Sequence, residues 1–355
     1  MSLTPFEHPF LSGLMGDAEI VPLFSAAADI AAMLRFETAL AHAQAEHGVI
    51  PADAAASIAS ALSDFTPDMD ALANGVARDG VVVPEFVRQL RRTVGGAASE
   101  NVHFGATSQD VIDTSLMLRL KAATGVLAGR LASAIAGFDA VQTRDGENAL
   151  MGHTRMQAAI PITVADRVQS WRAPLDRSAQ RLAHFSAKGF AVQFGGAAGT
   201  LEKLGDKGAD VRAALARRLD LADRPQWHSQ RDGLAAFAGI LSLISGSLGK
   251  FGQDVALLAE VGGEIRLSGG GGSSAMPHKQ NPVAAELLVS LARFNAVQLS
   301  AMHQSLVHEQ ERSGAAWTLE WLVLPQMVTA TGVALSTTIR LLGQIDRLGR
   351  ATHEG

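Results

Sequence analysis

Long intervals without proline constrain the fold of this chain more than any other feature. Prolines are absent from residues 85–160, 226–276 and 283–324, where alanine, leucine and arginine dominate. Alanine is the best helix former, whereas proline ends or kinks a helix. Alternating β-branched runs of strand length are nearly absent, apart from a short valine run that ends at Pro84. The sequence therefore predicts an all-α protein with unusually long helices.

The same spacing, read together with capping residues, predicts the order of the helices. Ser25 is a suitable N-cap, and Pro174 and Pro325 are expected to kink the helices that contain them. Four shorter helices are expected at 25–48, 52–63, 68–78 and 84–95. Five longer helices are expected at 107–146, 161–188, 229–266, 280–311 and 315–348.

A pair of glycines, Gly95 and Gly96, interrupts the helical pattern and marks a domain boundary near residue 97. Because the longer helices all follow this point, we expect two main parts and a short tail. The expected parts are an N-terminal helical domain at 1–97, a long-helix bundle at 98–348 and a tail at 349–355.

The long helices carry apolar residues over most of their circumference, for example at 235–241 and 287–291. A helix of this kind is buried on several sides. One chain of 355 residues cannot easily bury five such rods, so the sequence predicts an oligomer.

Composition excludes several classes of protein. The formal net charge of −5 implies no general affinity for nucleic acid or anionic membranes. The chain has no cysteine, so disulfides and thiolate metal sites are ruled out, in keeping with a reducing compartment. The N-terminus lacks the pattern of a signal peptide, and charges or glycines interrupt the apolar stretches. We therefore expect a cytoplasmic protein with no membrane span.

The stretch 269–282, Gly-Gly-Gly-Gly-Ser-Ser-Ala-Met-Pro-His-Lys-Gln-Asn-Pro, is the most distinctive motif. Four glycines leave the backbone free to approach a ligand, although such runs are also common in flexible linkers. A phosphate-binding loop would need Gly-Lys-Ser/Thr at its end, and here His278 and Gln280 flank Lys279. The stretch therefore predicts either a linker or a mobile segment that brings hydroxyls, a cation and an amide to a ligand.

This stretch resembles the signature Gly-Ser-Ser-x-Met-Pro-x-Lys-x-Asn of the fumarase/aspartase/argininosuccinate lyase superfamily. The resemblance implies that Ser273 is the catalytic base, with Lys279 and Asn281 as catalytic donors to developing negative charge. Ser274 and Met276, in the same signature, would contact the substrate. It also implies a five-helix bundle in each chain, four chains forming a twenty-helix homotetramer, and active sites that each draw residues from three chains.

A second cluster, 101–114, contains Thr-Ser-Gln-Asp at the start of the first long helix. By itself this sequence predicts an ordinary helix cap, but free amides and hydroxyls at a helix N-terminus also bind anions. The run resembles the first conserved region of the superfamily. The resemblance implies that Thr107, Ser108 and Gln109 bind a substrate carboxylate, with Asp110 in a structural role.

A third cluster, 152–161, places His153, Arg155 and Gln157 at alternate positions ahead of a proline. An extended segment would point all three side chains the same way, so they are expected to bind substrate together. The cluster resembles the second conserved region, where adenylosuccinate and argininosuccinate lyases have Thr-His-x-Gln with a general-acid histidine. Here Arg155 takes that position, and an arginine stays charged and cannot serve as the acid.

Three further stretches, 33–51, 226–233 and 308–321, resemble the branch of the superfamily that closes a lactone ring on 3-carboxy-cis,cis-muconate. That branch also lacks the general-acid histidine. The resemblance implies a small tricarboxylate substrate, with Arg312 among its counter-charges, and neither cofactor nor metal. Members carry roughly another hundred residues as a third small domain, which is expected to be absent here.

Three alternatives remain open from the sequence. The same chemistry could act on a related substrate such as 3-sulfomuconate, because a sulfonate presents a similar anion. An adenylosuccinate-lyase-like eliminase is disfavoured by Arg155. A non-catalytic helical scaffold is disfavoured because Ser273, Lys279 and Asn281 occur together.

Overall fold

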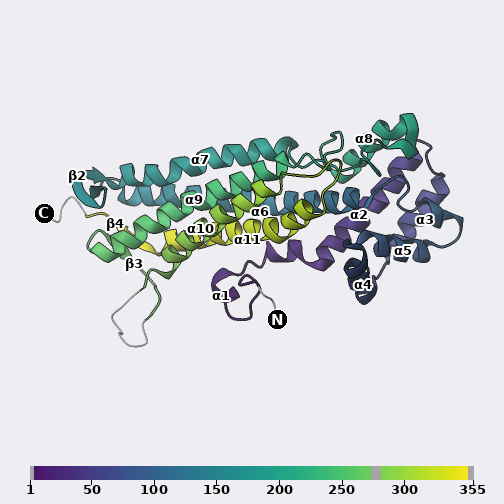
Figure 1. The fold of residues 1–355 in the computed structure, drawn as a ribbon. Helices are drawn as coiled ribbons and strands as arrows, with labels where there is room; N and C mark the ends of the chain where they lie inside the picture. The colour runs from purple at the N-terminus through teal and green to yellow at the C-terminus, as the bar shows by residue number, and fades with distance from the viewer. Residues whose placement is uncertain (1–3, 273–280, 351–355) are drawn as a thin grey trace.

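A computed structural model of the protein describes residues 4–272 and 281–350. The candidate residues Ser273, Ser274, Met276 and Lys279 therefore lie outside the described residues. The chain is mostly helical, as expected, and forms an elongated bundle with a group of shorter helices at one end (Figure 1).

Long helices that run side by side along the molecule make up the bundle (Figure 1). Prolines within two of them, Pro174 and Pro325, do not end the helix. The long helices are α6 (Ser108–Asp145), α7 (Val164–Lys188), α9 (Asp232–Val261), α10 (Val283–Gln304) and α11 (Ala315–Gln344).

Local sequence explains where these helices begin and end. The Asp110 carboxylate accepts the backbone N–H of Thr107 and so caps the start of α6. At the end of α9, Gly262 and Gly263 take φ angles of 75° and 80°, which only glycine adopts readily. The expectation that this helix continues to residue 266 is therefore wrong. The helix expected at 280–311 is also shorter, because α10 begins after Pro282 and ends at Gln304.

The bundle has an apolar core with aromatic side chains from three helices at its centre. Phe138 and Trp171 both pack edge-on or tilted against Phe251, with ring centroids 4.9 and 5.1 Å away, respectively. The indole N–H of Trp171 donates to Asp254 over 2.7 Å, so its one polar group is satisfied. Burying such a side chain contributes about 1.5–3 kcal/mol, which makes this core the main source of bundle stability.

A second apolar core lies at one end of the molecule, beneath the shorter helices. It includes α8, which the sequence analysis did not predict and which comes from the connection between α7 and α9. The helices are α2 (Ala26–Glu46), α3 (Ala52–Ser63), α4 (Met69–Asp79), α5 (Val83–Val94) and α8 (Gly208–Leu219). Helices that are far apart in the sequence, α2 to α5 and α8, thus pack together around the first turns of α6.

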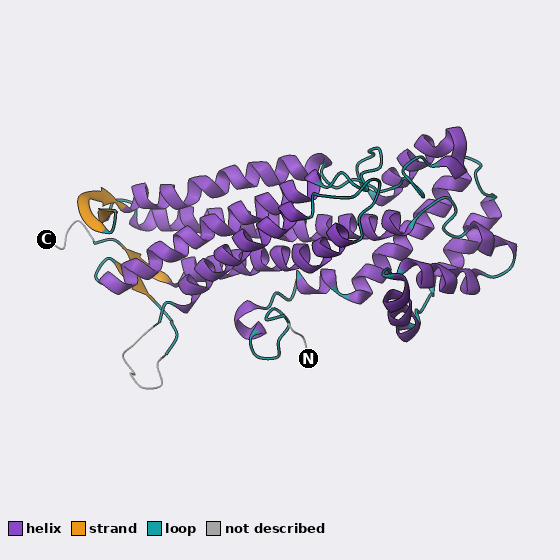
Figure 2. Cartoon of the chain, viewed as in Figure 1, coloured by secondary structure: helices purple, strands orange, loops and turns teal. Residues whose placement is uncertain are grey.

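Two small antiparallel sheets occupy the opposite end of the bundle (Figure 2). The helix expected at 315–348 is shorter, because the segment after α11 pairs with the segment after α9 instead of extending the helix to residue 348. The strands are β1 (Ala149–Thr154), β2 (Gln157–Thr163), β3 (Ile265–Leu267) and β4 (Ile345–Leu348). The remaining short elements are α1 (Ser12–Met15), η1 (Val21–Phe24), η2 (Ala97–Asn101) and η3 (Glu202–Lys207).

Three helices, α6, α9 and α11, are long and apolar enough to cross a membrane, judged by length and composition alone. The expectation that no stretch meets these criteria is therefore wrong. In the bundle the apolar windows of α9 and α11 are 61% and 72% buried, whereas that of α6 is only 33% buried. Of these three helices, α6 is thus the one that the rest of the chain covers least.

Candidate active site

The candidate residues lie at two opposite ends of the bundle. Thr107 and Ser108 stand at the start of α6, whereas the β1–β2 hairpin with His153 follows its end. A helix of 38 residues is about 57 Å long at 1.5 Å per residue. Arg312 and Asn281 are separated in the same way by α10, which runs between them. No single chain can bring these residues onto one small substrate.

At the start of α6, the carboxylate of Asp110 joins three backbone segments. It accepts the backbone N–H groups of Thr107, Gly195 and Gly196 over 2.9–3.0 Å, and it lies 2.8 Å from Nε2 of His228. Asp110 is completely buried, in keeping with the structural role expected for it. The carboxylate thus fixes the loop that begins at Gly195 beside Thr107 and Ser108.

Next to this carboxylate lies a buried group of charges on α6, α9 and α11. Arg231 forms ion pairs with Asp113 and with Glu320, and Trp317 donates its indole N–H to Asp113 over 2.9 Å. Burial opposes the charge on Arg231, but the two carboxylates outweigh it and raise the pKa of the guanidinium. Sequence analysis singled out 226–233 and 308–321 only as stretches, because ion pairs between distant helices leave no local pattern.

Gln109 connects this charge cluster to the candidate substrate-binding arginine. Its Nε2 donates to Asp113 over 3.1 Å and to the backbone carbonyl of His228 over 2.9 Å. Its Oε1 accepts from Nε of Arg312 over 3.0 Å. Gln109 has no exposed surface, so in this chain it has no contact to offer the substrate that the sequence analysis expected it to bind.

Arg312 lies on the exposed side of this network, in the connection between α10 and α11. A second hydrogen bond, from Nη2 to the carbonyl of Ala197, holds it over 3.1 Å. Both partners are neutral oxygens, and no carboxylate among residues 4–272 and 281–350 pairs with Arg312. The positive charge therefore remains available to an anion near Thr107 and Ser108.

At the opposite end, the β1–β2 hairpin does not have the extended geometry expected from the sequence. Arg155 and Met156 form its tip, with φ angles of 48° and 63° in the left-handed region. His153 pairs with Ala158, and Thr154 pairs with Gln157. Because paired residues share a face and successive residues alternate, His153 and Gln157 lie on opposite faces. The expectation of three side chains pointing the same way is wrong.

The glycine-rich segment begins and ends beside the second small sheet. The backbones of Gly271 and Asn281 exchange two hydrogen bonds of 2.8 and 3.0 Å, which close the base of the segment. A cavity of about 550 Å3 lies at this base and is lined in part by Asn281, Arg266 and Arg340. Asn281 is thus placed at the hairpin end of the bundle, far from Arg312.

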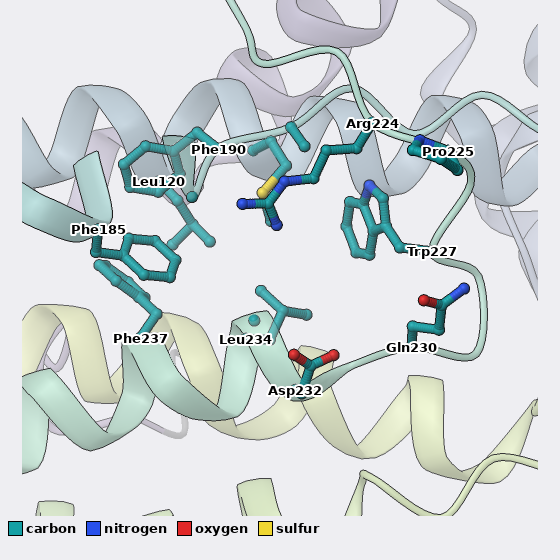
Figure 3. Close-up of a pocket in the computed structure, with 14 residues that line it drawn as sticks. Leu120, Phe185, Phe190, Arg224, Pro225, Trp227, Gln230, Asp232, Leu234 and Phe237 are labelled. Carbon is teal, nitrogen blue, oxygen red and sulfur yellow. The ribbon is translucent and has the colours of Figure 1, made fainter. Parts of the chain in front are cut away.

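Another pocket, of about 210 Å3, lies between the end of α7 and the start of α9 (Figure 3). Phe185, Phe190 and Phe237 form its apolar side, and Arg224 extends into it from the side of Trp227 toward Phe190 (Figure 3). None of the described candidate residues lines this pocket. It is therefore separate from the candidate site, although Trp227 also stacks on Arg231, with the guanidinium 4.7 Å from the ring centroid.

Comparison with known proteins places the chain in a family. The sequence profile of a lyase family matches residues 20–295. The chain belongs to this lyase family. The membership predicted from the sequence motifs is thereby confirmed, and so is the expectation of an enzyme.

Among the relatives in this family are bacterial cycloisomerases. The 3-carboxy-cis,cis-muconate cycloisomerase of Bradyrhizobium diazoefficiens is 38% identical over 95% of this chain and 77% of its own length. The corresponding protein of Pseudomonas aeruginosa is 41% identical over 96% of this chain and 76% of its own. The crystal structure of the 3-carboxy-cis,cis-muconate lactonizing enzyme of Pseudomonas putida superposes with a TM-score of 0.88 at 34% identity, covering 95% of this chain and 77% of that one.

Proposed function

We propose that this protein is a cycloisomerase that converts 3-carboxy-cis,cis-muconate to 4-carboxymuconolactone. The observation that carries the proposal is the similarity, over nearly the whole chain, to several proteins named for this activity. The free charge of Arg312 beside the start of α6 supports it, because the substrate carries three carboxylates and needs fixed cations and helix N–H groups.

In the proposed reaction, one carboxylate oxygen of the substrate adds to the carbon that bears the extra carboxyl group. The adjacent carbon becomes a carbanion next to another carboxylate and is then protonated. Ser273 is proposed to carry this proton, while Lys279 and Asn281 stabilise the developing charge. A donor of this kind is typically worth about 2.7–4 kcal/mol in the transition state. Arg312, with Thr107 and Ser108, would hold a carboxylate that does not react.

The active site is proposed to form between chains of a homotetramer. The two groups of candidate residues lie at opposite ends of the bundle, so antiparallel packing of chains would bring them together. The exposed side of α6 supports this packing, since small residues there allow close approach of another helix. These exposed residues are Ala122, Gly125, Ala128, Gly129, Ala132 and Ala136.

Loss of the conjugated-diene absorbance of 3-carboxymuconate tests the activity directly. The purified protein is expected to consume this substrate and to leave adenylosuccinate unchanged. Turnover of 3-sulfomuconate at a higher kcat/KM would transfer the proposal to that substrate, because the chemistry is the same. Light scattering is expected to give four times the chain mass of 37.1 kDa. A monomer with full activity would rule out a site shared between chains.

A further inference from the structure

Gln109 lies between the buried charge cluster and an arginine whose own charge is not neutralised by any described residue. We propose that Gln109 is a positioning residue, which holds Arg312 in place with its charge intact and its outer edge free for a substrate carboxylate. This role replaces the substrate contact expected from the sequence. The inference rests on the proposed function in one respect, because it takes the bound anion to be the substrate.

The surroundings of Gln109 determine which way its amide faces. Two acceptors, the Asp113 carboxylate and the His228 carbonyl, lie on the Nε2 side within 3.1 Å. A flipped amide would place its oxygen against both acceptors and its NH2 group against the N–H of Arg312. Both contacts would be repulsive, since an amide oxygen only accepts and a guanidinium only donates. The charge cluster therefore orients Gln109, and Gln109 in turn orients Arg312.

The two bonds to Arg312 leave one edge of its guanidinium open. Nε donates to Gln109, and one N–H of Nη2 donates to Ala197. A guanidinium has five N–H groups, so three remain, two on Nη1 and one on Nη2. The edge formed by Nη1 and Nη2 presents two parallel N–H groups, which is the geometry that a carboxylate binds with two hydrogen bonds. Arg312 is thus held through Nε and Nη2, and its Nη1–Nη2 edge is free to bind a carboxylate.

Gln109 also separates two opposite charges. Asp113 lies on its far side and already pairs with Arg231 and Trp317, so it has no need of Arg312. A neutral amide in the intervening position transmits the orientation of the cluster without cancelling the charge of Arg312. A glutamate at position 109 would accept from Arg312 equally well but would neutralise it. It would also place a second carboxylate beside Asp113, where like charges repel.

A double-mutant cycle tests the role in the assembled enzyme. Gln109→Met removes the hydrogen bonds with little change in volume. Its expected effect is a loss of about 10- to 100-fold in kcat/KM, mainly through a higher KM, because a charge-assisted hydrogen bond orients Arg312. In an Arg312→Met background, the same change is expected to alter kcat/KM by less than about twofold, since residues that act through one another are not additive.

Two further variants separate positioning from packing. Gln109→Glu is expected to raise KM more than Gln109→Met, because it neutralises the arginine. Gln44→Met is the matched control: Gln44 is equally buried, and its amide donates to the Phe104 carbonyl away from Arg312. This control is expected to lower the melting temperature to a similar extent and to leave KM unchanged.

Equal losses from Gln109→Met with and without Arg312 would overturn the proposal, because Gln109 would then act on the substrate or the fold. A wild-type KM for Gln109→Glu would overturn it as well. Failure of the proposed function would look different, since the wild-type protein would then not consume 3-carboxymuconate. Crystal structures of the wild type and of Gln109→Met decide in that case: the proposal requires Arg312 to lose its position in the variant, and an unmoved Arg312 contradicts it.

Discussion

The two ends of the helical bundle are built in opposite ways. At the start of α6 the charged side chains of Asp110, Asp113 and Arg231 are buried, and each has a hydrogen-bond or ion-pair partner within the chain. At the hairpin end, His153 and Arg155 are exposed, and the ion pair between Arg266 and Asp346 is loose at 3.9 Å, although Arg144 and the buried Asp145 pair closely at the end of α6. At one end the charged side chains pair across helices of a single chain, whereas at the other end the candidate side chains His153 and Arg155 face outward.

This difference indicates that the two ends contribute differently to substrate binding and catalysis. A preorganised site keeps its charges in place before the substrate arrives, which is how enzymes stabilise developing charge without reorganisation. The end with Arg312 has that property in one chain. The hairpin end does not, so we infer that a neighbouring chain completes it. Each prediction below changes one end and leaves the other intact.

The largest expected effect comes from mixing two variants that are each strongly impaired. Arg312→Met damages the end at the start of α6, and Ser273→Ala removes the proposed proton carrier at the other end, where a general acid–base group typically contributes about 100- to 10,000-fold. If each site combines both ends from different chains, mixed tetramers contain some sites with no damaged residue. Activity after joint refolding is therefore expected to rise to roughly a quarter of the wild-type value.

The control for this experiment is joint refolding of Arg312→Met with itself, which is expected to keep the low activity of that variant. Activity that fails to return in verified mixed tetramers would place Arg312 and Ser273 in the same chain's contribution to the site. The comparison between the two ends would then describe packing alone.

The second effect concerns stability. Arg231→Met leaves two buried carboxylates, Asp113 and Glu320, without their partner, and removing one member of a buried ion pair costs about 3–5 kcal/mol. Arg266→Met breaks an exposed pair at the other end and is expected to cost less than about 1 kcal/mol. Urea unfolding of both variants measures the difference. Similar losses in the free energy of unfolding would show that the two ends are not built differently.

The sequence predicted the fold well where a helix is defined by local features such as proline spacing and N-cap residues. The proline-free intervals located the long helices, and Ser25 and Thr107 stand at the N-caps of the helices that begin at 26 and 108. It missed α8, although the buried Val211, Leu215 and Leu219 follow a helical period. It also failed at a feature that needs two distant segments, the pairing of β3 with β4. Such contacts depend on how the chain returns to itself, which no local period records.

The candidate site shows the same limit. Motifs proposed roles for Thr107, Arg312 and Asn281, which stay predictions, and they assigned Gln109 to the substrate together with its neighbour Ser108. Helical geometry turns Gln109 inward, where it meets Asp113 one turn later on the same helix. Residues that are adjacent in a motif can thus differ in burial, and only the folded structure shows which of them is buried.

A smaller effect is expected at the tip of the hairpin. Arg155→Lys keeps the charge but loses the planar fork, so kcat/KM is expected to fall by about tenfold if Arg155 binds a substrate carboxylate. Arg155→His is expected to give no activity on adenylosuccinate, because one histidine does not rebuild that substrate's site. Steady-state kinetics on both substrates decides. Met156→Lys, at the adjacent tip position, controls for changes to the turn itself and is expected to leave KM unaltered.

The smallest effect separates two neighbouring glycines at the base of the glycine-rich segment. A Cβ added at Gly271 would lie 2.5 Å from Cγ2 of Val283, the first residue of α10, whereas one at Gly272 meets nothing within 4 Å. Gly271→Ala must shift the bridge to Asn281, and crowding of this kind costs about 1–3 kcal/mol, so turnover is expected to fall a few-fold. Gly272→Ala is expected to change it less. Single-turnover lactonisation measures both, and an equal loss at the two positions would show that chain flexibility, and not the close packing of Gly271 on α10, sets the requirement for glycine.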